Sequence, residues 1–315
     1  MESRPFPSVP DKLKPKVAVS VVVCTYRRPQ LLDLCLDSLV QQTAAIGPHE
    51  ILIIDNSPQR EAHPVVERWQ AVFAEREVAL RCVLEESTGV AFARNRGLAE
   101  ASAPLIAFID DDERALPGWL ERLIAPFAVF GERVDIVAGE VEPDFGGIPR
   151  PDWLSDDMLH IFSCRWGWDT EARFLRPQEW FGEGNCAFRK RLFDTQEFPT
   201  DLGRNGGNLM SSEGAVFAPL RAKGAATYFV PQAKVSHRIH QDRLDKRWVL
   251  RRMFYQGISN YIAHRRYGMT EPCQDFNISL EKLMALDVDV LDAKTLHALS
   301  GLYYKLGYTT ASNMY

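Results

Sequence analysis

Hydrophobic residues in the first 140 positions follow two alternating patterns. The run VAVSVVVC at 17–24 is apolar on both faces, which is typical of a central strand in a parallel sheet. Apolar residues then recur at helical spacing from 31 to 40. The same reasoning predicts strands at 51–55, 78–84 and 104–110, and helices at 62–76, 90–101 and 116–130. This alternation predicts a Rossmann-like α/β fold, with a mostly parallel central sheet and helices on both faces.

The pattern changes beyond residue 140. A segment at 143–184 is rich in Pro, Gly and Trp and gives no residue-by-residue assignment, whereas apolar runs at 226–231 and 233–237 predict two further strands. From about 244 the spacing is mainly helical. We therefore predict a flexible N-terminal tail at 1–15, one main domain at 16–243 and a helical C-terminal extension at 244–315.

The composition restricts the class of protein. With 315 residues, 46% of them hydrophobic and 25% charged, the chain is an ordinary globular protein. A net charge of -5 argues against nucleic acid as a partner. The six cysteines have neither paired metal spacing nor the density of a disulfide-stapled domain, so we expect a cytoplasmic protein. The absence of 18 uninterrupted apolar residues predicts no transmembrane helix and leaves peripheral attachment open.

Polar side chains follow three predicted strands, at the ends where parallel sheets bind ligands. TYRR at 25–28 follows the first strand and Asp55 ends the second. The third runs into FIDDDE, where Asp110, Asp111 and Asp112 repel one another unless a cation lies close. Oxygen-rich sites of this kind suit Mg²⁺ or Mn²⁺. A solvated turn that caps the next helix is the alternative interpretation.

Five segments occur in a distinctive order: VSVVVCTYRRP, ILIIDNS, GVAFARNRGLAEA, PLIAFIDDDE and PGWL. Together they closely resemble family 2 glycosyltransferases of the GT-A fold, over about residues 17–240. The resemblance implies inverting transfer of a sugar from a nucleoside-diphosphate sugar to an acceptor hydroxyl, with Mn²⁺ or Mg²⁺ as cofactor. UDP is the first candidate nucleotide, with GDP and dTDP open. It divides the main domain into a nucleotide-binding half at about 16–140 and an acceptor and sugar half at about 141–243.

The resemblance implies roles for residues of the first half. Those expected to hold the nucleotide are Thr25, Tyr26, Arg28, Asp55, Arg94, Asp110 and Asp111. Within the acidic run, Asp110 would face the ribose and Asp112 would bind the metal. Asp55 has a competing interpretation as a turn residue in DNSP, and Arg94 as an exposed helix arginine.

In the second half, the resemblance implies that Glu213 is the catalytic base, because it stands eleven residues before Gly224. Ser212 departs from the family's pattern, in which that position is acidic. The alternative for Glu213 is a helix N-terminal glutamate favoured by the helix dipole.

Further residues are implied near the phosphates and the sugar. His237 is a candidate metal ligand, and Asn185 and Glu183 are candidates for contacts with the donor sugar or the acceptor. Residues that could close over the phosphates as a mobile lid are Arg238, His240 and Arg243. A structural histidine and a solvated loop are the alternatives.

The start of the helical extension is basic and amphipathic. Residues 234–266 contain nine Lys or Arg and two acidic residues, and apolar side chains recur every four residues at Leu250, Phe254, Ile258 and Ile262. Such a helix can lie on anionic lipid at the inner face of a membrane and reach a lipid-linked acceptor. Alternatively, the stripe docks the extension onto the main domain.

Acceptor, pathway and oligomeric state stay open. The acceptor is a saccharide, a lipid-linked or a small molecule, in polysaccharide, glycolipid or glycoconjugate biosynthesis, and a homodimer is among the alternatives. A sugar nucleotidyltransferase is disfavoured, because TYRRP lacks the glycines of a phosphate loop. A catalytically silent sugar-binding or scaffold protein is the third hypothesis, suggested by Ser212.

Overall fold

The computed structural model describes residues 19–42, 49–166, 170–176, 179–204, 209–211, 213–269 and 286–314. The predicted tail at 1–15 lies outside them. The strands are β1 (Val19–Thr25), β2 (His49–Asp55), β3 (Ala79–Leu84), β4 (Leu105–Phe108), β5 (Glu113–Ala115), β6 (Ile136–Asp144), β7 (Arg173–Phe174), β8 (Cys186–Arg189) and β9 (Thr227–Arg238). The α-helices are α1 (Pro29–Val40), α2 (His63–Ala74), α3 (Val90–Glu100), α4 (Trp119–Phe130), α5 (Phe217–Ala222), α6 (Lys246–Tyr267) and α8 (Ala293–Met314). The 3-10 helices are η2 (Gly131–Arg133), η3 (Asp156–Phe162), η4 (Glu183–Asn185), η5 (Lys190–Phe193), η6 (Glu213–Val216), η7 (Gln241–Arg243) and η8 (Val288–Val290).

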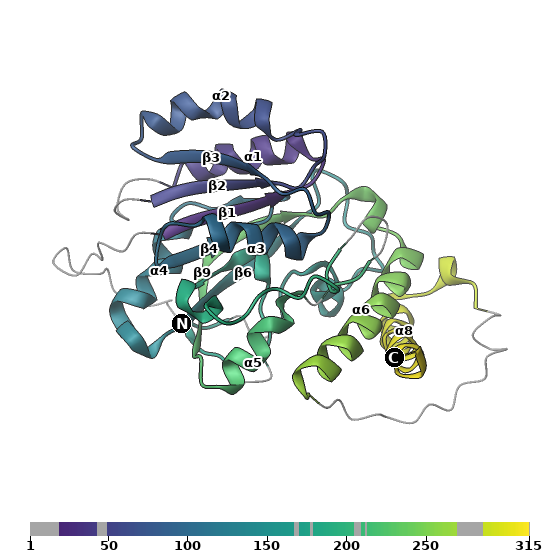
Figure 1. The fold of residues 1–315 in the computed structure, drawn as a ribbon. Coiled ribbons are helices and arrows are strands. Elements are labelled where there is room, and N and C mark those ends of the chain that lie inside the picture. Colours follow the sequence, from purple (N-terminus) through teal and green to yellow (C-terminus); the bar gives the residue numbers. More distant parts are fainter. Residues whose placement is uncertain are drawn as a thin grey trace, which may run out of the picture.

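The strands form one sheet in the order β3-β2-β1-β4-β8-β6-β9-β5, and β7 pairs with β9 (Figure 1). β1 runs parallel to β2 and β4, β2 to β3, and β6 to β9. Antiparallel pairs join β8 to β4 and β6, and β5 and β7 to β9. Six of the nine strands in the described residues therefore share one direction, which confirms the predicted mostly parallel sheet.

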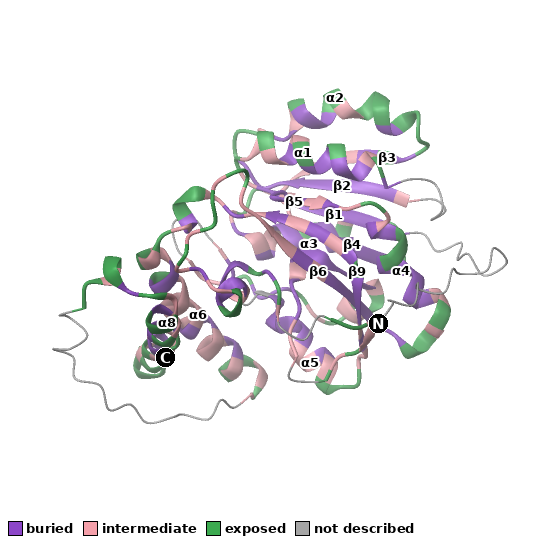
Figure 2. Cartoon of the chain, turned by 180° about the vertical axis from the view of Figure 1, so that it is seen from behind, coloured by how far each residue is buried: buried purple, intermediate pink, exposed green. Residues whose placement is uncertain are grey.

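Helices cover both faces of the sheet. Val19, Val21 and Val23 of β1 pack into a core with α1, α2 and α4, whereas Val22 packs into a second core with α3 and α5. Successive side chains of a strand point to opposite faces, so a strand that is apolar throughout serves two cores. Figure 2 shows the buried residues gathered in the sheet and on the inner sides of the helices.

The second half of the sheet differs from the prediction: β5 and β6 were not predicted, and β9 was predicted as two strands. The two strands predicted at 226–231 and 233–237 form one continuous strand, β9, with a bulge between them. At this bulge the neighbouring residues Gly139 and Glu140 of β6 pair with Val230 and Lys234 of β9. A Cβ on Gly139 would lie 2.0 Å from the carbonyl oxygen of Ala233, so this close approach requires glycine.

The helical extension contains two long helices packed on each other, α6 and α8 (Figure 1). A Cβ on Gly257 would lie 1.9 Å from the Tyr304 carbonyl oxygen, and one on Gly307 would lie 1.8 Å from that of Phe254. These crossed pairings show that the helices run antiparallel in close contact. Leu250 of the predicted stripe packs in the core shared with the main domain, as the docking alternative expected. None of the described helices is long and apolar enough to cross a membrane.

Candidate active site

A cavity of about 1000 Å³ opens beyond the carboxyl ends of β1 and β4. This volume is at the upper end of the range for small-molecule sites. The predicted site residues that line it are Thr25, Tyr26, Arg28, Arg94, Asp110, Asp111, Asp112, Glu183, His237 and Arg243. Segments far apart in the sequence therefore converge on one site, as expected for the strand ends of an α/β sheet.

Asp111 and Asp112 are held together by Arg28. The Arg28 guanidinium donates to Asp111 Oδ1 at 3.1 Å and to Asp112 Oδ2 at 3.0 Å, and the Thr25 hydroxyl donates to Asp111 Oδ2 at 2.7 Å. Burial raises the pKa of Asp111 to about 7, although Arg28 acts in the opposite direction. Arg28 thus offsets much of the repulsion between the two buried carboxylates.

Asp112 lies at the centre of a group of cationic and imidazole side chains. Its carboxylate oxygens lie 3.5 Å from Arg243 Nη2, 3.6 Å from His237 Nε2 and 4.0 Å from His240 Nε2. Burial alone would raise the pKa of Asp112, but His237, Arg28 and Arg243 hold it well below its ordinary value. Asp112 is therefore a carboxylate at neutral pH.

Two histidines lie near the Asp112 carboxylate. His237 Nδ1 lies 3.0 Å from the Phe162 carbonyl oxygen, and Nε2 lies 3.6 Å from Asp112 Oδ1. Burial acts to lower the pKa of His237, but the Asp112 carboxylate raises it well above its ordinary value, so a metal bound between the two side chains would displace a proton from Nε2. A backbone carbonyl behind the imidazole is a common second contact of metal-ligating histidines. In the described residues, buried His240 Nε2 has no hydrogen-bond partner. His237 Nε2 and His240 Nε2 thus lie near different oxygens of the Asp112 carboxylate, and carboxylate oxygens of the acidic run are ligands of the kind that Mn²⁺ or Mg²⁺ takes.

Asp110 is the open member of the acidic run. Its side chain is 39% exposed, whereas the side chains of Asp111 and Asp112 are each 6% exposed. Arg94, itself only 3% exposed, lies 3.4 Å from Asp110 Oδ1 and stacks over the rings of Phe108 and Phe198. The alternative of an exposed helix arginine is wrong, because Arg94 is a buried cation at the cavity wall.

Glu113 is a cavity residue that the sequence analysis missed. It is 4% exposed, its carboxylate accepts a hydrogen bond from the Asp110 amide at 3.1 Å, and it lies opposite His237 in the β5–β9 ladder. Burial and the Asp110 carboxylate raise the pKa of Glu113 to about 8. The sequence did contain a sign of this residue, because Glu113 is the fourth acidic residue of FIDDDE.

Asp55 does not line the cavity. Its fully buried carboxylate accepts hydrogen bonds from the Ser57 and Ala62 amides, each at 2.9 Å, so the turn interpretation fits the structure better. The adjacent Asn56 lines the cavity instead. Its amide oxygen accepts from the Gly89 amide at 2.8 Å, which fixes the approach to α3.

Asn185 and Arg238 are also directed away from the cavity. Asn185 is fully buried and bonds Trp119 Nε1 and the carbonyl oxygens of Glu140 and Ala233, which uses both of its amide hydrogens. It therefore joins α4, β6 and β9 rather than meeting a sugar. Arg238 pairs with Asp144 at 3.0 Å, because it follows His237 on β9 and points to the other face. Of the three predicted lid residues, only His240 and Arg243 lie at Asp112.

Glu183 and the start of η6 lie against each other at the cavity. A Cβ on Gly214 would lie 1.7 Å from Glu183 Oε1, so only glycine allows this contact. η6 begins at Glu213, whose side chain lies outside the described residues, as does Ser212. The backbone position of Glu213 is thus beside the cavity, next to the Glu183 carboxylate.

α6 supplies a wall that the sequence analysis did not assign to the site. Trp248, Arg252, Gln256 and Asn260 line the cavity on one side of this helix. The Arg252 guanidinium donates to the Ser211 hydroxyl at 3.2 Å, which ties α6 to the segment before η6. The helical extension therefore completes the cavity.

The sheet, the acidic run after β4 and the cavity at the strand ends define a glycosyltransferase of the GT-A fold. The family model described as "Glycosyl transferase family 2" matches residues 20–195. The chain belongs to glycosyl transferase family 2 and is an enzyme of carbohydrate synthesis.

Several proteins are similar to this chain over most of its length. The glucosyl-dolichyl phosphate glucuronosyltransferase of Haloferax volcanii is 27% identical over 276 residues, which cover 86% of this chain and 84% of that protein. Succinoglycan biosynthesis protein ExoM of Rhizobium meliloti is 23% identical, covering 83% and 80%. The structure of mannosyltransferase PcManGT from Pyrobaculum calidifontis, in complex with GDP-Man and Mn²⁺, matches 98% of this chain and 78% of that one. The two structures superpose with a TM-score of 0.60 at 18% sequence identity, which shows that they share a fold.

Proposed function

We propose that this enzyme is a metal-dependent, inverting glycosyltransferase that uses a nucleoside-diphosphate sugar. The observation that carries the proposal is the acidic run Asp110, Asp111 and Asp112 at the cavity beyond β4, with His237 Nε2 lying 3.6 Å from Asp112. Mn²⁺ or Mg²⁺ bound there would neutralise the charge that develops on the departing nucleoside diphosphate. Arg28 and Arg243, which already contact Asp112, would hold the phosphates.

The donor nucleotide is proposed to lie between β1 and α3. Thr25 and Tyr26 lie on one side of this part of the cavity and Arg94 on the other, with the open carboxylate of Asp110 placed to accept from ribose hydroxyls. UDP is our first candidate, with GDP and dTDP as alternatives. Solved relatives of the same fold carry GDP-Man, UDP or UDP-GlcNAc in their complexes.

We propose Glu213 as the base that takes the proton from the acceptor hydroxyl, which then attacks the anomeric carbon from the face opposite the diphosphate. Its backbone lies beside Glu183 at the cavity. Glu183 is our candidate for a contact with the sugar or the acceptor hydroxyl. Residues 16–140 would then form the nucleotide-binding half and 141–243 the acceptor half, completed by α6.

A thermal-shift screen tests the proposal. UDP, GDP and dTDP are each added with and without Mn²⁺, since a ligand that binds only the folded state raises the melting temperature. One nucleotide is expected to stabilise the protein more strongly with Mn²⁺ than without it. No shift with any nucleotide, at concentrations that stabilise a known family member in parallel, would contradict a nucleotide-sugar donor.

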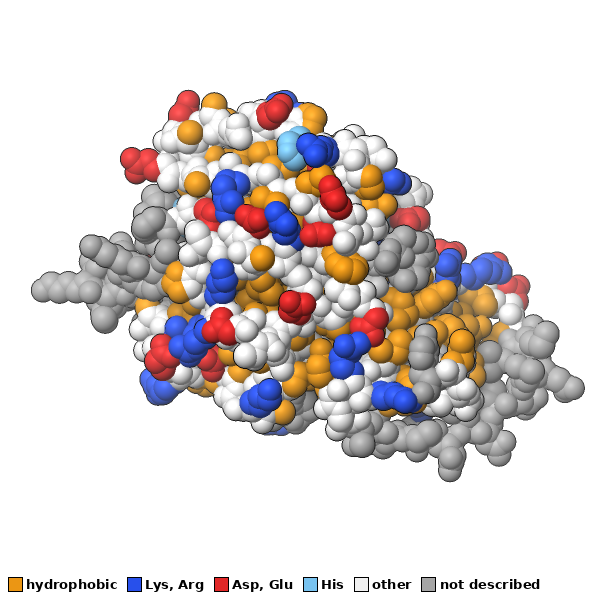
Figure 3. Space-filling view, in the orientation of Figure 1, with side chains coloured by type: hydrophobic (Ala, Val, Ile, Leu, Met, Phe, Trp, Pro, Cys, Tyr) orange, Lys and Arg blue, Asp and Glu red, His pale blue; other side chains and the backbone are white. Residues whose placement is uncertain are grey.

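We further propose a cytoplasmic enzyme that contacts the inner face of the membrane through its extension. Hydrophobic side chains and blue Lys and Arg lie together over the helical extension in Figure 3. The relative from Haloferax volcanii acts, by its name, on a dolichyl phosphate sugar, which makes a lipid-linked acceptor one candidate. Co-sedimentation with anionic vesicles that is lost at high salt would support this contact. No recovery with anionic vesicles at low salt would contradict the contact and favour an acceptor in solution.

A further inference from the structure

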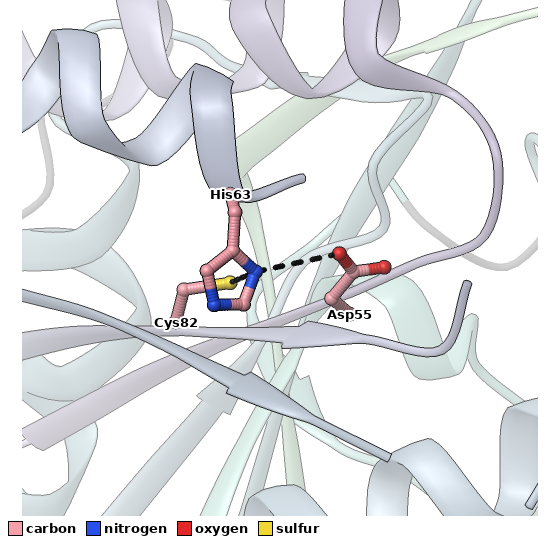
Figure 4. A group of neighbouring side chains, drawn as sticks. All are labelled: Asp55, His63 and Cys82. Atoms are coloured by element: carbon pink, nitrogen blue, oxygen red, sulfur yellow. Dashed lines mark hydrogen bonds and ion pairs between the residues drawn. The ribbon is translucent and has the colours of Figure 1, made fainter. Parts of the chain in front are cut away.

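Three side chains outside the cavity converge on one point: Asp55, His63 and Cys82 (Figure 4). His63 Nδ1 lies 3.5 Å from Cys82 Sγ and 3.8 Å from Asp55 Oδ2, and the three ligand atoms all lie within 4.8 Å of one another. They come from the end of β2, the first turn of α2 and the middle of β3. Asp55 and Cys82 share a face of the sheet, because Cys82 pairs with Ile53, two residues before Asp55.

Hydrogen bonding within the cluster does not explain this arrangement fully. Sγ and Oδ2 both face the same ring nitrogen of His63. If His63 Nδ1 carries a proton, that proton can be donated to Cys82 Sγ or to Asp55 Oδ2, but not well to both. If Nδ1 carries no proton, its lone pair faces the Asp55 carboxylate. A cation at the shared point would satisfy all three atoms at once.

The same geometry excludes a Cys-His-Asp catalytic triad. In a triad the acid and the nucleophile contact opposite nitrogens of the imidazole, so that a proton taken at one is balanced at the other. Here both contact Nδ1. Burial and the Asp55 charge also raise the pKa of the Cys82 thiol to about 12, the opposite of an activated nucleophile.

We propose that Asp55, His63 and Cys82 bind one Zn²⁺ ion. One sulfur, one imidazole nitrogen and one carboxylate oxygen form a ligand set that suits zinc, with a water in the fourth position. Tetrahedral zinc with its usual bond lengths places sulfur and nitrogen about 3.5 Å apart, and nitrogen and oxygen about 3.3 Å apart. The first distance is already present, and the second requires a closure of about half an ångström from 3.8 Å.

Each ligand has the freedom that the site needs. Asp55 Oδ2 accepts one backbone hydrogen bond and retains a lone pair, since a carboxylate oxygen can accept two. The His63 side chain is 38% exposed, which gives the ion a path from solvent. Binding would displace the thiol proton, so affinity is expected to rise with pH.

A zinc ion here would clamp the turn after β2. It would link β2, β3 and α2 through Asp55, whose backbone contacts fix residues 57 and 62. Asn56, inside that turn, lines the active-site cavity. The zinc site therefore lies behind the donor wall, and it does not depend on the proposed transfer reaction.

The test measures zinc in a protein whose other metal site has been removed. Chelator-treated Asp112→Asn protein with reduced thiols is dialysed against Zn²⁺, and the bound metal is counted. One zinc per chain is expected, with a rise in melting temperature. Cys82→Ser and His63→Ala, each added to Asp112→Asn, are expected to weaken binding at least 10-fold.

Matched controls distinguish this site from scattered thiols and imidazoles. Cys186→Ser removes a buried thiol that donates a hydrogen bond to the Glu183 carbonyl oxygen, and a serine hydroxyl can make the same bond. His297→Ala removes a histidine of α8. Both should bind zinc as Asp112→Asn does. Co²⁺ should give a thiolate charge-transfer band that Cys82→Ser abolishes. No stoichiometric zinc in Asp112→Asn, or equal binding in its Cys82→Ser and His63→Ala variants, would overturn the proposal.

Discussion

Asp112 and Asp55 begin from similar positions in the fold. Asp112 follows β4 and Asp55 ends β2, and both strands are neighbours of β1 in the sheet. The two residues lie at the same edge of the sheet, and each is almost fully buried. Asp112 faces Arg28, Arg243 and His237 at the cavity, whereas Asp55 accepts hydrogen bonds from backbone amides of its own turn and lies 3.8 Å from His63, outside the cavity. The position at a strand end therefore does not by itself set the surroundings of a carboxylate, which depend on the atoms that its lone pairs face.

The sharpest test of this contrast is Asp112→Ala. We expect it to abolish metal-dependent donor binding and to lower transfer by at least about 10²-fold, since charge stabilisation of a leaving group is worth several kcal/mol. The fold should persist, because the change also relieves repulsion with Asp111. Donor titrations with and without Mn²⁺ and a melting curve measure both effects. Near-wild-type turnover with unchanged Mn²⁺ dependence would remove Asp112 from the metal site.

Glu213→Gln extends the test to the acceptor side of the cavity. We expect nucleotide affinity to be retained and transfer to fall by about 10² or more, because a general base commonly contributes 10²- to 10⁴-fold. Single-turnover transfer and nucleotide titration on the same preparation separate the two quantities. If affinity and rate fall together, Glu213 binds the donor or supports the fold, and another residue is the base. Glu183→Gln is the matched comparison, since Glu183 lies beside η6 at the same wall.

The parts of the enzyme that sequence could predict are those set by local pattern. Strands and helices of the first half follow from apolar periodicity, and the acidic run suggested a cation site from its composition, with a solvated turn as the alternative. The orientation of each side chain was not predictable, because it depends on partners distant in sequence: Asn185 bonds Trp119, Glu140 and Ala233. The β2–α2–β3 cluster was missed for the same reason, since Asp55, His63 and Cys82 have no metal-binding spacing along the chain.

Asp55→Ala tests the structural side of the contrast. It leaves the buried amides of Ser57 and Ala62 without their acceptor, and each unsatisfied donor costs about 1–3 kcal/mol. We expect a clear loss in the free energy of unfolding, measured by denaturant, with a smaller loss of turnover per folded molecule than in Asp112→Ala. A variant of normal stability that no longer binds nucleotide would return Asp55 to the donor site.

The smallest effect concerns a third carboxylate, Glu50, near the opposite end of β2 from Asp55. It accepts hydrogen bonds from Ser20 and Ser102 and pairs with Arg81 at 3.1 Å. Burial by itself would raise the pKa of Glu50, but these contacts lower it to about 2, against about 4.3 in an unfolded chain. Because the folded-state pKa is the lower one, the charged form stabilises the fold above about pH 4.3, and this contribution is lost as the pH falls toward about 2. Glu50→Gln should therefore lower stability at pH 7 and flatten its dependence on pH between those values, when unfolding is followed in denaturant. An unchanged slope in that window would show that other carboxylates set the acid response.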